Sequence, residues 1–110
     1  MSGGHFNYDQ YKIGYIADEI EQLIRDNGSE EKDQYGYNKH SNFSDEVIEK
    51  FHEALVCLKV AQIYAHRIDW LVSGDDGEDS FLSRLKQDKK NLRDELYKFF
   101  DEVENADGTK

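Results

Sequence analysis

Hydrophobic residues recur every three or four positions over the first quarter of the chain, from about residue 9 to residue 27. The apolar positions are Ile13, Ile16, Ile20, Leu23 and Ile24. This spacing predicts an amphipathic helix, and Asn27 and Gly28 supply a common helix end. The next residues, 28–43, show no period and are rich in turn formers, so they predict an irregular loop.

A longer and more regular pattern follows over about residues 44–72. Ser44 is a favourable N-cap, and Asp45 and Glu46 behind it suit the positive end of a helix dipole. Apolar side chains then form a heptad seam made of Phe51, Ala54, Leu58, Ala61, Ala65, Ile68 and Val72. At roughly 1.5 Å per residue, this helix is about 40 Å long.

A third periodic segment, about residues 79–104, predicts a helix capped by Asp79 or Ser80. Short connections between helices favour antiparallel neighbours. We therefore predict an all-α fold, a three-helix bundle in which the second and third helices form a long antiparallel hairpin. Residues 1–110 form one domain with an aromatic arm at 1–8 and a frayed tail at 105–110.

The charge balance limits the classes of partner. The formal net charge is −10, from 14 Lys and Arg against 24 Asp and Glu, which disfavours direct binding to nucleic acid or to anionic membranes and suits a protein partner. The chain has one cysteine, Cys57, and no apolar run near the roughly 20 residues that span a bilayer. We expect a cytoplasmic protein.

The acidic stretch DDGED at residues 75–79 could be a metal loop or a helix corner. An EF-hand loop needs glycine at its sixth position and glutamate at its twelfth, and starting from Asp75 or from Asp76 neither requirement is met. Gly74 and Gly77 instead allow two sharp turns, and Asp79 suits the start of the next helix. We predict a structural corner and no metal site.

No set of residues for catalysis is apparent. Glu49-x-x-His52 is a single pair, whereas a carboxylate-bridged di-metal centre needs two such pairs and two further glutamates. No glycine-rich phosphate loop is present. The chain is therefore predicted not to be an enzyme and to need no cofactor.

Three polar residues interrupt the apolar side of the second helix. Gln62, His66 and Asp69 are four and three residues apart, so they lie along one side, next to Arg67 and Trp70. They could form a hydrogen-bonded seam that fixes helix register, with Asp69 orienting His66. Alternatively, they could bind a small ligand or a partner, with Trp70 as the stacking surface.

The N-terminal arm combines flexible glycines with the aromatic residues His5, Phe6 and Tyr8. It could pack over the bundle as a lid, or it could clamp a flat ligand. Packing is the commoner role for such residues, but an aromatic arm that begins with Gly-Gly is unusual for a disposable terminus.

Two stretches, SGGHFNY at residues 2–8 and RIDWLVSGDDGEDSFLSRLKQD at residues 67–88, together resemble a group of small bacteriophage and prophage proteins. The shared features are a Ser-Gly-Gly-His-Phe opening and an Arg-Ile-Asp-Trp-Leu…Ser-Gly-Asp-Asp-Gly corner. The positions that carry them are His5, Phe6, Tyr8, Arg67, Asp69, Trp70, Gly74, Asp75, Asp76 and Gly77. The resemblance implies the host cytoplasm as location and no particular activity.

These observations favour a non-enzymatic acidic helical binding protein that inhibits or modulates a host or phage protein, such as a host defence factor. The alternative is a protein that binds or sequesters a nucleotide-like messenger. A DNA mimic ranks lower because acids alternate with Lys and Arg, as in KQDKKNLRDE. Helices this long on so short a chain also predict a homo-oligomer, because one short helix cannot cover their apolar stripes.

Overall fold

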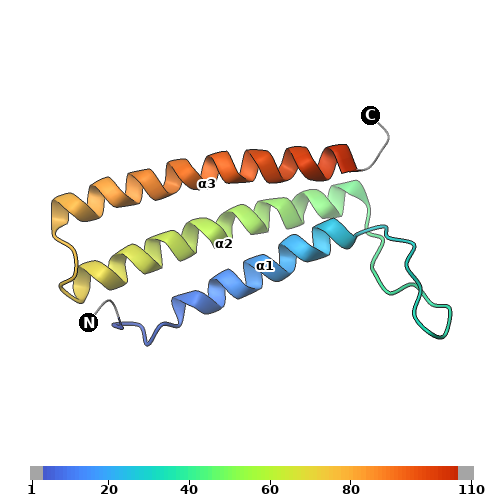
Figure 1. Ribbon diagram of the computed structural model, residues 1–110, viewed down its shortest axis with the longest axis horizontal. Coiled ribbons are helices and arrows are strands. Elements are labelled where there is room, and N and C mark those ends of the chain that lie inside the picture. Colours follow the sequence, from blue (N-terminus) through green and yellow to red (C-terminus); the bar gives the residue numbers. More distant parts are fainter. Residues whose placement is uncertain (1–3, 107–110) are drawn as a thin grey trace.

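The computed structural model describes residues 4–106 and consists of three α-helices. They are α1 (Gln10–Asp26), α2 (Asp45–Val72) and α3 (Glu78–Ala106), and α2 lies between the other two (Figure 1). The predicted all-α bundle with a long antiparallel hairpin is confirmed. Within the described residues, no helix has an apolar stretch sufficient to cross a bilayer.

Local signals set the helix ends. The Ser44 hydroxyl accepts a hydrogen bond from the Val47 N–H at 3.3 Å, as expected of an N-cap. After α1, Gly28 adopts a left-handed φ of 81°. α3 begins at Glu78, so Asp79 and Ser80 lie inside the first turn and neither is the cap that we predicted.

The two predicted terminal segments are only partly described. α3 continues to Ala106, so residues 105 and 106, which we assigned to the tail, belong to the helix. Residues 107–110 of the tail and residues 1–3 of the arm lie outside the described part of the chain.

The bundle is a thin, elongated layer. Its extents are 54 × 31 × 19 Å, and its radius of gyration is 17.6 Å, against about 13 Å for a compact domain of this length. Because α1 and α3 lie on two sides of α2, large parts of both helix pairs face outward (Figure 1). The chain therefore has a small interior and much exposed helix surface.

The core lies where all three helices come together. Its fully buried apolar residues are Ala17, Ile24, Leu55, Leu92, Leu96 and Phe99. Leu55 is completely buried although the heptad seam omitted it, whereas Ala61, Ile68 and Val72 of the predicted seam are exposed. The seam was partly wrong because α2 packs against helices on two sides, so its buried positions do not fall on one line.

Ion pairs cross the bundle beside this core. Arg25 of α1 lies over the ring of Phe99 at 4.7 Å and pairs with Glu102 at 3.5 Å. Lys59 of α2 pairs with Glu21 of α1 at 3.6 Å and with Glu95 of α3 at 3.3 Å. These contacts fix the order of the helices at the end of the molecule where α1 meets α3.

Candidate functional site

Asp69 of α2 holds the N-terminal arm against the bundle. Its carboxylate is only 1% exposed and accepts four hydrogen bonds. Three come from the successive backbone N–H groups of Gly4 (3.1 Å), His5 (2.6 Å) and Phe6 (3.3 Å), and the fourth from Gln10 Nε2 (3.1 Å). The arm thus wraps its backbone around a single buried carboxylate.

The arm conformation explains why three neighbouring amides can point at one group. Gly4, Asn7 and Tyr8 have positive φ angles of 101°, 54° and 62°, so the chain turns tightly before α1. Successive N–H groups in such a turn form a concave anion-binding nest. Burial alone raises the pKa of Asp69, but the hydrogen bonds to its ionised form outweigh burial and lower the pKa below its ordinary value.

This contact joins the two stretches that carry the phage-protein resemblance. His5 and Phe6 of the first stretch bind Asp69 of the second, although more than 60 residues separate them. The expected pairing of Asp69 with His66 is not formed, because the oxygens of Asp69 bind the arm and Gln10. The polar residue on the apolar side of α2 therefore positions the arm.

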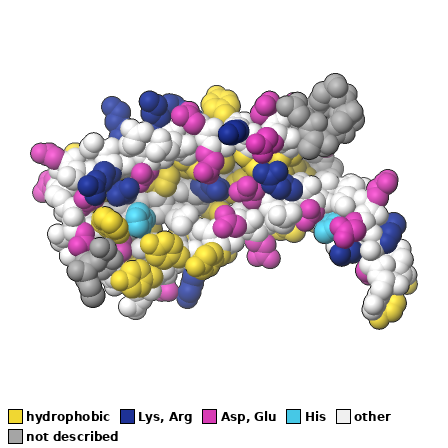
Figure 2. Space-filling model, in the orientation of Figure 1, with side chains coloured by type: hydrophobic (Ala, Val, Ile, Leu, Met, Phe, Trp, Pro, Cys, Tyr) yellow, Lys and Arg dark blue, Asp and Glu magenta, His cyan; other side chains and the backbone are white. Residues whose placement is uncertain are grey.

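An aromatic row continues from the arm across α2. Tyr8 stacks on Tyr11 with ring centroids 6.4 Å apart, Tyr11 lies 6.2 Å from His66, and His66 lies 5.4 Å from Trp70. Figure 2 shows hydrophobic side chains beside a histidine at this end of the molecule. The buried His66 Nδ1 has no hydrogen-bond partner among the described residues. Tyr8, Tyr11, His66 and Trp70 are called the aromatic row below.

Two further polar residues of α2, Arg67 and Gln62, contact the neighbouring helices. Arg67 forms a two-pronged ion pair with Asp88 of α3, with Nε–Oδ2 at 2.6 Å and Nη2–Oδ1 at 3.3 Å, and the pair raises the pKa of Arg67. Gln62 lies over Gly14 of α1, where a Cβ atom would come within 2.6 Å of the Gln62 amide. Arg67 is thus already neutralised within the protein.

A shallow pocket of about 430 Å³ lies on the other side of the arm. It is lined by His5, Phe6, Asn7, Asp9, Gln10, Ile13 and Ala65. The lining contains no lysine or arginine, so the pocket offers no cation for a phosphate group.

The acidic stretch after α2 forms the predicted corner. Gly74 has a φ of 84°, and the Trp70 carbonyl accepts hydrogen bonds from the N–H groups of Asp75 (2.9 Å) and Asp76 (3.3 Å). The Gly77 carbonyl accepts from the N–H of Phe81 as α3 begins. Asp76 also pairs with Arg84 Nη1 at 3.0 Å. In residues 4–106, no three His, Cys, Asp or Glu side chains gather closely enough to hold a metal ion.

Residues 28–43 are more regular than the sequence predicted. They leave the bundle and fold back on themselves, with a bridge between Lys32 and Asn38 and a hydrogen bond from the Lys39 N–H to the Glu31 carbonyl at 3.0 Å (Figure 1). The base is closed by the Gly28 N–H, which donates to the Ser41 carbonyl at 2.8 Å. We call residues 28–43 the tyrosine hairpin.

The tip of the tyrosine hairpin presents two tyrosines to solvent. The Asp33 carboxylate accepts from the backbone N–H groups of Tyr35 (2.8 Å) and Tyr37 (3.0 Å), and Gly36 between them has a φ of 84°. The tyrosines are 74% and 72% exposed, and Figure 2 shows hydrophobic side chains at the far end of this projection. We predicted an irregular loop over residues 28–43 and not this ordered hairpin, although Asp-x-Tyr-Gly-Tyr contains an Asx-turn signal.

Comparison with known proteins adds no further assignment. No protein-family model matches the chain, and no curated protein and no solved structure matches it. The resemblance to small phage proteins therefore stays a prediction, and the functional proposal rests on the geometry described above.

Proposed function

We propose that this chain is a non-enzymatic binding protein that attaches to another protein through the tyrosine hairpin. The observation that carries the proposal is the exposure of Tyr35 and Tyr37, 74% and 72%, at the tip of a hairpin that projects from the bundle (Figure 1). Exposed tyrosines contribute nothing to the interior of the fold. In protein interfaces, however, tyrosine is among the residues that dominate binding energy.

The hairpin is suited to binding because its own hydrogen bonds hold it in shape. Asp33 fixes the tip, while the Asn27 side chain and the Phe43 backbone form two hydrogen bonds across the base, at 2.8 and 3.1 Å. Phe43 also packs against Phe51 of α2, with the ring centroids 5.6 Å apart. A segment already ordered before binding loses less conformational entropy in the complex, and tyrosine offers a large contact area with few rotatable bonds.

A protein partner fits the charges better than a nucleotide or a nucleic acid does. The chain has a net charge of −10, Arg67 is paired with Asp88, and the pocket beside the arm lacks a cation. Phosphate binding usually depends on unpaired Arg or Lys. The resemblance to phage proteins suggests that the partner is a host protein, for example a defence factor, which this chain inhibits or modulates.

The test is co-purification from bacterial lysate with matched variants. The unmodified chain and Tyr15→Ala, whose tyrosine is 69% exposed on α1, should retain the same host protein. Tyr35→Ala/Tyr37→Ala should retain at least tenfold less of it, because both anchors are lost. Equal retention by the hairpin variant, or no specific protein retained by any of the three, contradicts the proposal.

A second candidate function is binding of a flat, uncharged or weakly charged molecule on the aromatic row. It is favoured by the unpartnered His66 Nδ1 between Tyr11 and Trp70. A thermal-shift screen with nucleosides and nucleotides tests it, because a ligand that binds only the folded state raises the melting temperature. No shift, or the same shift in Trp70→Ala, removes this candidate.

A further inference from the structure

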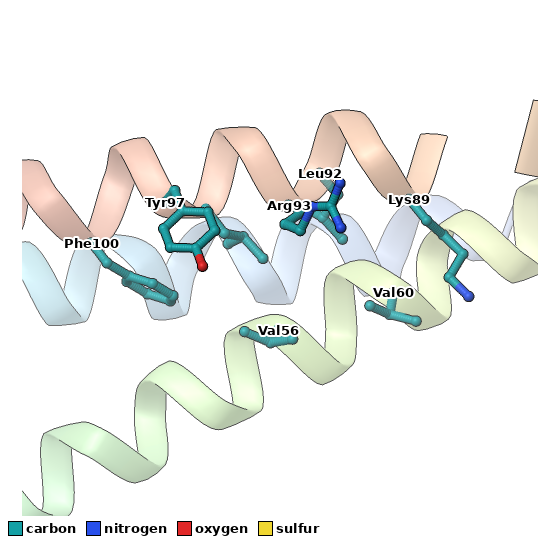
Figure 3. Close-up of a pocket in the computed structure, with 8 residues that line it drawn as sticks. Val56, Val60, Lys89, Leu92, Arg93, Tyr97 and Phe100 are labelled. Carbon is teal, nitrogen blue, oxygen red and sulfur yellow. The ribbon is translucent and has the colours of Figure 1, made fainter. Parts of the chain in front are cut away.

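We propose that the face of α2 and α3 opposite α1 binds a second copy of this chain, independently of the tyrosine hairpin. On this face the two helices enclose an apolar groove of about 310 Å³ (Figure 3). It is lined by Val56, Val60, Lys89, Leu92, Arg93, Leu96, Tyr97 and Phe100. The groove is the shallow outer side of the α2–α3 contact and continues the core toward solvent.

The α2–α3 hairpin has exposed apolar side chains both at the groove and elsewhere along its length. Tyr97 is 73% exposed at the groove, and further along the hairpin Ile68, Val72 and Leu82 are exposed as well. Cys57, next to Val56, is also exposed. Uncovered apolar surface of this kind is typical of a protein–protein contact.

The charges along the face identify the second copy as the occupant. Lys89 lies at one end of the groove, and Arg93 lies one helical turn further along α3 (Figure 3). Helical spacing puts an acid beyond the other end, because Glu104 is four residues after Phe100. The face thus has a basic residue, Lys89, toward one end and an acidic residue, Glu104, toward the other, as a self-complementary antiparallel contact requires.

The spacing also fixes the position of the symmetry axis. Lys89 is eight residues before Tyr97 and Glu104 is seven residues after it, or about 12 and 10 Å along the helix. A two-fold axis that lies in the interface and crosses α3 at Tyr97 brings the Lys89 of each copy to the Glu104 of the other. In this arrangement α3 packs on α3 and α2 on α2, in opposite directions, and the two Tyr97 rings meet at the centre.

The contact is tested by light scattering over a range of concentrations. The unmodified chain should be a dimer, and Tyr97→Arg should weaken dimerisation at least tenfold because two like charges then meet at the axis. Tyr15→Arg, an equally exposed tyrosine on α1, should leave the dimer unchanged. A monomer at all concentrations, or a Tyr97→Arg variant that dimerises normally with an unchanged circular dichroism spectrum, overturns the proposal.

An exchange of the charged residues between two variants distinguishes binding of a second copy from binding of another protein. Lys89→Glu and Glu104→Lys should each weaken dimerisation when present alone, but the two variants mixed should form a heterodimer. Cys57 is the only cysteine of the sequence, is exposed, and directly follows Val56 of the groove, so a short bismaleimide should join two copies of the unmodified chain but not of Tyr97→Arg. Failure of the mixture to associate contradicts the antiparallel arrangement.

Discussion

Replacement of Asp69 by asparagine should release the N-terminal arm. Asparagine keeps the shape of the side chain, but it has one acceptor oxygen where the carboxylate has two. If that oxygen stays with His5 and Phe6, the new NH2 group faces the N–H of Gly4, donor against donor. Gln10 can turn its amide to accept from the NH2 group, because its Oε1 atom has no partner.

The expected loss in the free energy of arm docking follows from these changes in hydrogen bonding. Hydrogen bonds to a charged group contribute about 1.5–3 kcal/mol each, and neutral ones about 1 kcal/mol. One bond is lost, to Gly4, and those with His5, Phe6 and Gln10 become neutral. With the lower figure of about 1.5 kcal/mol for a charged bond, docking of the arm should weaken by about 3 kcal/mol. For a domain of this size, that lowers Tm by roughly 12 °C if the arm and the bundle unfold together.

Two measurements check the result. Hydrogen exchange at the backbone amides of His5 and Phe6 reports arm docking directly, and thermal denaturation reports its effect on the bundle. Asp94→Asn on α3 removes an exposed carboxylate and should change neither by more than about 0.5 kcal/mol. If Asp69→Asn retains protected arm amides and an unchanged Tm, the carboxylate does not hold the arm and the reasoning is wrong.

Three further predictions concern pH and the core. The pKa of Asp69 is lower in the folded protein, so its contribution to stability is present above the ordinary carboxyl pKa of about 3.9 and is lost as pH falls below that value. The backbone amides of the arm should therefore lose their protection from hydrogen exchange as pH falls below about 3.9. Leu55→Ala should cost about 3–4 kcal/mol in urea denaturation, because the side chain is fully buried in a small core. Burial lowers the pKa of His52, so in the pH range just below its ordinary value of about 6.5 the unfolded chain binds a proton that the folded chain does not. Stability should fall on acidification through that range, and His52→Leu should show a smaller fall.

The positions of the helices could be predicted because the signals that set them are local. Ser44 caps α2, and Gly28 and Gly74 take left-handed conformations where α1 and α2 end. Each of these effects acts within about one helical turn, so a short window of sequence contains it. The corner at residues 74–77 was recognised for the same reason.

Burial along α2 could not be predicted from its periodicity alone. Leu55 is completely buried, whereas Ala61 and Ile68 of the expected seam are exposed. A single heptad line assumes one neighbouring helix, but α2 has two, on different sides. Which residues point into the interior depends on how the helices cross, and that is decided by contacts far apart in the chain.

The sequence by itself determined the number, length and ends of the helices, and it identified Asp69 as a polar residue on an apolar side. Only the tertiary structure showed that Asp69 binds the arm, and that Tyr35 and Tyr37 stand at the tip of an ordered hairpin. The physical reason is that the hydrogen-bond partners of such a side chain are mostly backbone groups. Backbone N–H groups bind Asp69, and because almost every residue has one, no residue type reveals which of them will meet a given carboxylate.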